Sequence, residues 1–255
     1  MTETRKLLER YMRQTAELGG GEIYLDTMTP KELLDGLLAR MEGREVGAAA
    51  SGAAAAMSAV AAMSGVAPTI NSPLPLLAQR AAVCQLCRLW EGRTHAVFGE
   101  GSATADLLVV GEAPGEAEDR TGRPFVGRAG KLLDLLLLTA GFPREAVYIC
   151  NVLKCRPPGN RNPLPDEVGM CTTNYLFPQL DAIAPKAILA VGKFAAQSLL
   201  NTEESISRLR GTTHNYRGTP LIVTYHPAYL LRSPQMTRAA WEDYQRARKV
   251  LDGQV

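Results

Sequence analysis

Four carboxylates and one aromatic residue lie in a glycine-rich stretch, residues 111–130, that follows a short apolar run. The run, residues 107–110, is typical of a buried parallel strand, and residues 130–138 are typical of a largely buried helix. Ligands of open α/β sheets bind beyond the carboxyl ends of the strands. The stretch therefore predicts a ligand site. The ring of Phe125, which lies among turn residues, is expected to be exposed there. The carboxylates are Glu112, Glu116, Glu118 and Asp119.

Four of the five cysteines are candidates for a metal centre. Cys84 and Cys87 form a CxxC pair, and Cys155 and Cys171 follow far downstream. Disulfides are not expected in a chain without an export signal, whereas zinc and an iron–sulfur cluster both accept thiolates. The residues alone leave zinc and a cluster open, and no flavin or nicotinamide fingerprint accompanies them, so a structural role fits at least as well as a redox role. Cys150 lies in a strand pattern and is expected to pack in the core.

Two more strand candidates end at polar residues. Residues 146–150 are followed by Asn151, and residues 221–225 are followed by His226. Because parallel strands end at one edge of a sheet, we expect Glu112, Asn151 and His226 to converge there although they lie far apart in the sequence.

The elements that must position these residues alternate between strands and helices. Strands are predicted at 107–110, 146–150, 187–191 and 221–225, and helices at 130–138, from 165 onward, at 193–200 and at 235–251. Such alternation predicts an α/β fold with a parallel sheet and helices on both of its faces.

The N-terminal part of the chain differs in composition from the rest. The chain has 255 residues and a net charge of +2, but residues 1–72 carry a net −2 and residues 73–255 a net +4. We predict a helical extension at 1–45, an Ala/Gly/Ser-rich linker at 46–72 and one domain at 73–255. The mild basic bias of the domain suits a polyanionic partner without demonstrating one. The first 45 residues carry charges throughout, and the uncharged run after them lacks the density of Leu, Ile and Phe that a membrane span needs. We therefore expect no membrane association and a cytoplasmic location.

Five motifs in order give the chain a specific resemblance. After the CxxC pair come GEAPGEAED with GRPFVGRAG, then NVLKCRPPGNR, then Cys171, and finally YHPAYLLR. The set resembles the family 4 uracil-DNA glycosylases, the iron–sulfur branch of that superfamily, over about residues 84–250. The resemblance implies a three-layer αβα fold around a four-stranded parallel sheet. It also implies a [4Fe-4S] cluster on Cys84, Cys87, Cys155 and Cys171, which resolves the choice between zinc and iron.

The resemblance implies excision of uracil from DNA by hydrolysis of the N-glycosidic bond, which leaves an abasic site for base excision repair. The extruded base must be gripped while negative charge develops on its O2. His226 is expected to donate to that oxygen, Asn151 to pair with N3–H and O4, and Phe125 to stack on the ring. Ala113 stands where a better-known branch has a water-orienting Asp, so Glu112 is the first candidate for that task, shared in part by Asn151. Glu118 is a candidate to oppose the C5 methyl group of thymine. The expected uracil-binding set is Gly111, Glu112, Ala113, Glu118, Phe125, Asn151 and His226.

The motif that contains His226 resembles the loop that enters the minor groove. Leu230 or Leu231 is expected to fill the gap that the extruded base leaves. The expected phosphate contacts are Arg232, Lys154, Arg156 and Arg161.

Two other functions remain open from the sequence. One is a non-catalytic or covalently trapping uracil-DNA binder, although residues 159–163 contain neither the histidine nor the insertion of the trapping branch. The other is an iron–sulfur electron carrier. We expect a nucleoid-associated monomer that acts on single- or double-stranded uracil-DNA, with residues 1–72 free to bind a repair or replication partner.

Overall fold

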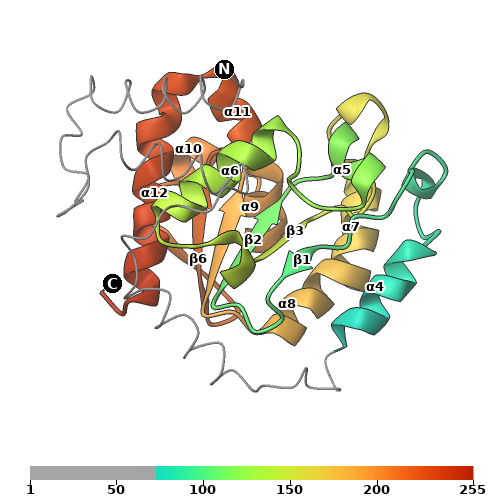
Figure 1. The fold of residues 1–255 in the computed structure, drawn as a ribbon, viewed down its shortest axis with the longest axis horizontal. Coiled ribbons are helices and arrows are strands. Elements are labelled where there is room, and N and C mark those ends of the chain that lie inside the picture. The colour runs from blue at the N-terminus through green and yellow to red at the C-terminus, as the bar shows by residue number, and fades with distance from the viewer. Residues whose placement is uncertain (1–72, 255) are drawn as a thin grey trace, which may run out of the picture. The chain divides into compact units, whose positions relative to one another are not determined.

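A sheet in the order β1-β3-β2-β4-β6-β5 forms the centre of the computed structural model, which describes residues 73–254 (Figure 1). The inner strands β3, β2, β4 and β6 run parallel, so the predicted four-stranded parallel sheet is confirmed. The predicted extension at 1–45 and linker at 46–72 lie outside the described residues. The strands are β1 Glu100–Gly101, β2 Leu107–Gly111, β3 Tyr148–Asn151, β4 Ala187–Val191, β5 Thr213–Tyr216 and β6 Thr219–Thr224.

The antiparallel edge strands β1 and β5 were not predicted. β1 has only two residues, and β5 is mostly polar and partly exposed, so neither shows the apolar run of the inner strands. A tight hairpin joins β5 to β6, because Arg217 and Gly218 both have positive φ and the N–H of Gly218 donates to Asn215 Oδ1 at 2.8 Å.

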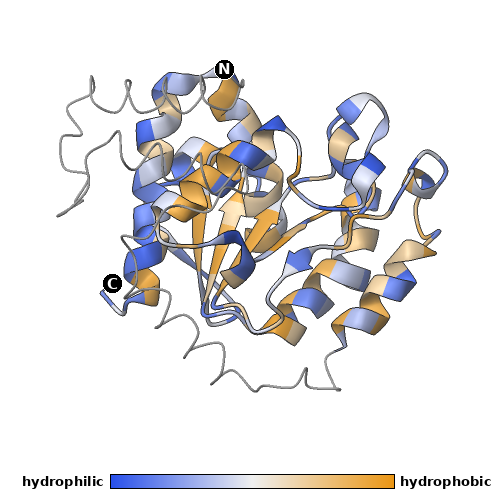
Figure 2. Cartoon of the chain, in the orientation of Figure 1, coloured by the Kyte–Doolittle hydropathy of each residue, from blue (hydrophilic) through white to orange (hydrophobic). Residues whose placement is uncertain are grey.

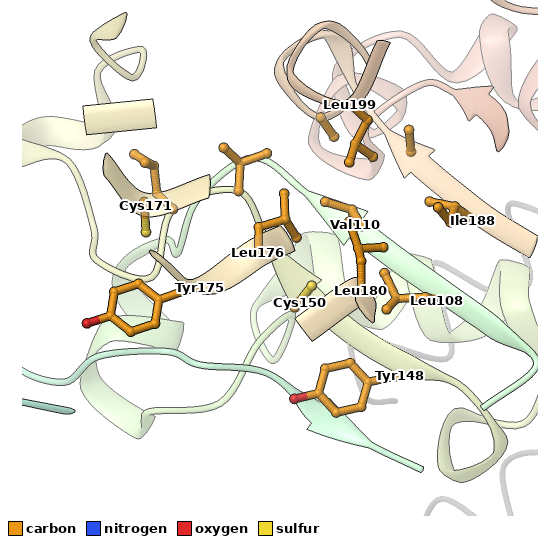
Figure 3. Packing of buried hydrophobic residues seen from close by; sticks show 14 of the residues in the cluster. Leu108, Val110, Tyr148, Cys150, Cys171, Tyr175, Leu176, Leu180, Ile188 and Leu199 are labelled. Carbon is orange, nitrogen blue, oxygen red and sulfur yellow. The ribbon is translucent and has the colours of Figure 1, made fainter. Parts of the chain in front are cut away.

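Helices cover both faces of the sheet, as the three-layer prediction requires (Figures 1 and 2). In β2, Leu108 and Val110 pack into one core cluster with α4, α8 and α9, whereas Leu107 and Val109 pack into another with α6, α11 and α12. All five β2 residues are buried, which explains why the strand is apolar throughout rather than alternating. Cys150 lies in the first cluster, as predicted, and Figure 3 shows it among the leucine side chains there.

The helix boundaries follow the sequence with small shifts. The prediction at 193–200 is confirmed by α9, and the others move by a few residues. The short α5, which lies inside the glycine-rich stretch, was not predicted. None of the helices within residues 73–254 is long and apolar enough to cross a membrane. The helices are α4 Leu74–Ala82, α5 Glu116–Thr121, α6 Arg128–Thr139, α7 Pro165–Cys171, α8 Phe177–Ile183, α9 Lys193–Leu200, α10 Ile206–Leu209, α11 Pro227–Arg232 and α12 Thr237–Leu251.

A π-helical turn, Thr172–Leu176, joins α7 to α8. Pro178 lies at the start of α8 and has no N–H for the preceding turn, so a local change in helical winding is expected there. The turn comes directly after Cys171, which is the last residue of α7.

Candidate functional site

The carboxyl ends of β2 and β3 bring the predicted residues together. Gly111 and Asn151 are the last residues of these neighbouring strands and pair directly in the sheet register. The pairing continues past both strands, because the N–H of Leu153 donates to the carbonyl of Glu112 at 3.0 Å. β6 ends at Thr224, two residues before His226, so His226 lies at the same edge.

Gly111 is the residue around which Asn151 and Phe125 meet. A Cβ at position 111 would overlap both Asn151 Oδ1 and the ring of Phe125. The ring of Phe125 in turn lies 5.7 Å from the His226 ring, centroid to centroid, at an angle of 32°. The structure therefore places an amide, an aromatic ring and an imidazole next to one another, and glycine is required where they meet.

The predicted openness of Phe125 is wrong, since its exposure is only 5%. Its backbone has φ of 50°, a left-handed conformation that a side chain larger than glycine rarely adopts. Gly130 permits this turn, because a Cβ there would overlap the backbone of Phe125. The ring is consequently turned inward, against Gly111 and His226, rather than outward.

Arg144 holds the carbonyl groups of this turn. Its guanidinium donates to the carbonyl of Pro124 at 2.6 Å and to that of Phe125 at 3.3 Å. It also pairs with Glu100 and Asp134, each at 2.5 Å. Burial would raise the pKa of Glu100, but hydrogen bonds from Arg123 and Arg144 hold it below its usual range. No motif in the sequence indicated Arg144, because its partners come from three separate segments.

Asn151 supplies a buried acceptor that lacks a partner. Its exposure is 1%, and no hydrogen bond reaches Oδ1 from any residue in the described part of the chain. Buried polar atoms are almost always hydrogen-bonded in native proteins, and the exceptions need an explanation. A bound group with an N–H donor would satisfy this oxygen.

His226 is held as a neutral donor. It caps α11, where its Nδ1 accepts a hydrogen bond from the N–H of Ala228 at 3.1 Å. The remaining proton of a neutral ring must then reside on Nε2. Burial, and after it the charge of Arg232, lowers the pKa of His226 to about 4. The imidazole is therefore uncharged near neutral pH and can donate one hydrogen bond from Nε2.

The two predicted carboxylates have different environments. Glu112 is half-buried, and burial raises the pKa of its carboxyl group. Glu118 is buried and accepts hydrogen bonds from the N–H groups of Gly115, Val126 and Gly127 at 3.1, 2.9 and 2.8 Å. Both oxygens of Glu118 thus bind the backbone of the loop. These hydrogen bonds fix the direction of the Glu118 side chain within the loop, and its expected role opposite the C5 methyl group stays a prediction. Ala113, next to Glu112, is half-buried.

Three predicted DNA contacts are not available as expected. Leu230 has an exposure of 1% and packs in the second core cluster, whereas its neighbour Leu231 is half-buried and remains the candidate for insertion into DNA. Lys154 also has an exposure of 1% and cannot reach a phosphate at the surface. Arg161 donates to both oxygens of buried Glu167, at 2.9 and 2.6 Å, so its charge is already paired.

The other two predicted arginines differ in what they contact. Arg156 donates to Asn160 Oδ1 at 2.8 Å and lies 3.7 Å from a carboxylate oxygen of Glu116. Arg232 is exposed at the end of α11, beside Leu231. Arg232 and Leu231 are thus the predicted DNA-binding residues that the fold presents at the surface next to His226.

The four predicted metal-binding cysteines lie close enough for their charges to raise one another's pKa. Cys155 and Cys171 are buried, while Cys84 and Cys87 are half-buried. Burial raises the pKa of Cys171 to about 12, and the charges of Cys155 and Cys87 add to this effect. The backbone N–H of Lys154 donates to Cys171 Sγ, and Arg93 donates to Cys155 Sγ, each at 3.2 Å. Within residues 73–254, no three His, Cys, Asp or Glu side chains lie close enough to hold a metal ion.

The αβα sheet, with its polar residues at one edge, is consistent with what comparison with known families shows. The sequence profile described as Uracil DNA glycosylase superfamily matches residues 98–245, and the chain belongs to this superfamily.

Within the superfamily the chain belongs to the type-4 group. It is 42% identical over 182 residues to the type-4 uracil-DNA glycosylase of Thermotoga maritima, which covers 70% of this chain and 94% of that protein. It is 44% identical over 171 residues to the type-4 enzyme of Archaeoglobus fulgidus, covering 64% of this chain and 85% of that protein. A type-5 enzyme of Pyrobaculum aerophilum is 33% identical over 174 residues, 61% of this chain and 76% of that protein. The family resemblance of the motifs is thus confirmed.

Proposed function

We propose that this chain excises uracil from DNA by hydrolysing the N-glycosidic bond, leaving an abasic site. The observation that supports this activity most directly is the unpaired, buried Oδ1 of Asn151 beside Phe125 and His226. Uracil has an N3–H donor for this oxygen, a flat face for the aromatic ring and an O2 acceptor for the imidazole. Membership of the type-4 group supports the same activity.

The amide of Asn151 selects uracil over cytosine. Its Oδ1 accepts from N3–H, and its Nδ2 donates to O4 of the same base. Cytosine presents an acceptor at N3 and a donor at C4, so both contacts would be mismatched. A site built around such hydrogen bonds rejects the wrong base strongly because its own buried groups are left unpaired.

His226 stabilises the charge that develops as the base leaves. Cleavage of the bond between the sugar and N1 moves an electron pair onto the base, mainly to O2. The Nε2–H of a neutral imidazole donates to this oxygen and strengthens its bond as charge builds up. Water then adds to the sugar cation, and the half-buried carboxylate of Glu112 orients it and accepts its proton.

Leu231 and Arg232 contact the DNA on the side of His226. Leu231 fills the space in the stack from which the base is extruded, and Arg232 binds a phosphate. If so, Arg232→Ala weakens binding and reduces the slope of log affinity against log salt by about 1. An unchanged slope would exclude this phosphate contact.

We propose that Cys84, Cys87, Cys155 and Cys171 hold a [4Fe-4S] cluster. The four thiols are grouped, and N–H donors reach two of the sulfurs, as is common around thiolate ligands. Four thiols without a carboxylate or imidazole among them are the donor set that such a cluster would take. When bound, the cluster supplies a covalent tie between residues 84–87 and the segment from 155 to 171.

Excision is tested with a uracil-containing oligonucleotide and subsequent alkali. Strand breakage that requires alkali shows an abasic product, whereas a complex that resists denaturant shows covalent trapping. Asn151→Ala and His226→Ala are each expected to lower single-turnover excision at least about 100-fold with the fold retained. If the wild-type protein gives no alkali-sensitive product, the proposed activity is refuted, and unchanged excision by either variant removes that residue from the mechanism.

A further inference from the structure

Lys154 is a buried cation without a carboxylate partner. Its exposure is 1%, and its Nζ donates to the backbone carbonyl of Asn151 at 2.7 Å. The same nitrogen lies 5.8 Å from the centre of the Phe98 ring. Across residues 73–254, no Asp or Glu side chain forms an ion pair with it. A buried ammonium group is unfavourable unless an opposite charge compensates it, so the fold must supply negative charge from another source.

Lys154 adjoins the proposed cluster site through its backbone. Its backbone N–H donates to Cys171 Sγ at 3.2 Å, and Cys155 is the next residue in the chain. The charge of Lys154 also lowers the pKa of the Cys150 and Cys171 thiols. Burial raises both pKa values by more than Lys154 lowers them. Lys154 therefore stands between the cysteine set and the strand end that carries Asn151.

We propose that Lys154 is the counter-ion of the iron–sulfur cluster and couples the cluster to the residue that reads uracil. This inference rests on the cluster and the role of Asn151 proposed above. Four thiolates outweigh the positive charge of the iron–sulfur core, so the loaded site is net negative and compensates the ammonium group. The hydrogen bond from Nζ then fixes the carbonyl of Asn151 and, through it, the direction of the side-chain amide.

A dependence of base recognition on the cluster follows from this arrangement. Without the cluster, the ammonium group would be buried with no opposite charge and would have to move toward water. Such a movement breaks the hydrogen bond to Asn151, although no cysteine touches the base. Two hydrogen bonds hold the backbone of Lys154. Its N–H donates to Cys171 Sγ, and its carbonyl accepts from the N–H of Val97 at 2.7 Å.

The test compares Lys154→Met and Lys154→Gln with the wild type, all as full-length, iron-loaded proteins. Met removes the charge and the hydrogen bond, whereas Gln removes the charge but retains an N–H donor. Lys186→Met is the control, since Lys186 is exposed and pairs with Asp106 at 3.1 Å. Cluster loss to a chelator is followed by visible absorption and iron content, and binding of free uracil is followed by calorimetry.

Both Lys154 variants are expected to lose the cluster about 10-fold faster or more, the usual effect of removing an outer partner of a metal site. Lys154→Met is also expected to bind uracil about 10-fold more weakly, with Lys154→Gln between it and the wild type. The Lys186 control should match the wild type in both measurements. Unchanged cluster lifetime and uracil affinity in Lys154→Met would overturn the proposal.

A second measurement uses the wild type alone and remains decisive if the variants fail to fold. Chelation of the cluster is expected to increase amide hydrogen exchange at residues 151–155, whereas unchanged exchange would overturn the coupling. A wild-type protein that excises uracil but contains no iron would refute the cluster and this inference together. The excision activity would then stand on its own.

Discussion

Acidification should lower the free energy of unfolding of the wild-type protein more than that of a His226→Gln variant. The pKa of His226 is lowered to about 4 in the folded chain, mainly by burial, from an ordinary value of 6.5. Between these two values the unfolded chain binds a proton at this residue and the folded chain does not. The free energy of unfolding therefore falls as the pH drops through this window, and the contribution of the neutral ring is complete above it.

The size of the effect follows from the two values. Each pKa unit corresponds to about 1.4 kcal/mol, so the full shift is worth roughly 3 kcal/mol, and about 2 kcal/mol of it appears between pH 8 and about pH 5. The His226 ring is only half-buried, and solvent screening reduces the expected loss to about 1 kcal/mol or somewhat more.

Urea unfolding of the wild type and His226→Gln at about pH 8 and pH 5 measures this loss. The amide of glutamine does not titrate, and shifts from the carboxylates are common to both proteins. The wild type should lose about 1–2 kcal/mol more than the variant over this range. Equal losses in the two proteins would show that His226 is not held neutral by its surroundings. His226 would then not act as a neutral Nε2–H donor.

Three further substitutions, the last with a matched control, test other parts of the site. Glu112→Gln should slow single-turnover excision about 100-fold. It should also abolish the decline of the wild-type rate at acid pH, because the raised pKa of Glu112 lets its carboxylate take up a proton as the pH falls. A decline that persists in the variant would assign it to another group. Gly111→Ala should weaken binding of free uracil at least about 10-fold in calorimetry, because the added Cβ would overlap the ring of Phe125. Wild-type affinity in this variant would show that the ring can shift without harm to uracil binding. Arg144→Met should lower the free energy of urea unfolding by about 2 kcal/mol, since half-buried Asp134 and the carbonyls of Pro124 and Phe125 lose their donor while Glu100 keeps Arg123, whereas the exposed Arg123→Met should cost less than about 1 kcal/mol. Equal losses for the two arginines would contradict the assignment of Arg144 as the residue that holds the Phe125 turn.

The meeting of the site residues at one edge of the sheet could be predicted because the ends of buried strands can be recognised in a sequence. Apolar runs of four or five residues marked β2, β3, β4 and β6, and a parallel sheet aligns their carboxyl ends whatever lies between them. Gly111, Asn151 and His226 therefore fell at one edge as expected. Phe125 was placed there correctly by the resemblance, but its inward direction depends on a left-handed turn that its own residue type disfavours.

The errors concern side chains whose direction depends on partners elsewhere in the chain. Arg161 and Lys154 have the residue types of phosphate contacts, yet Glu167 pairs with the first and the carbonyl of Asn151 accepts from the second. Leu230 and Leu231 are adjacent, and only the rotation of α11 against the sheet decides that the first is buried. Residue type and spacing do not carry this information.

Two ion networks, one half-buried and one buried, stabilise different sides of the site. On the Phe125 side, Arg144 binds the turn carbonyls and two carboxylates. On the His226 side, Arg210 pairs with Asp243 of α12 at 2.6 Å, and its guanidinium lies 4.2 Å from the centre of the Tyr225 ring.

Tyr225 directly precedes His226 and also packs against Tyr229 of α11 at 5.2 Å, centroid to centroid. Neither arginine belongs to the edge of the sheet where the base would lie. Arg144 nevertheless binds the backbone of the Phe125 turn, and Arg210 packs on the residue before His226. A planar guanidinium suits both tasks better than a flexible ammonium group. The positions of Phe125 and His226 relative to each other are therefore set by two arginines that no motif in the sequence indicates.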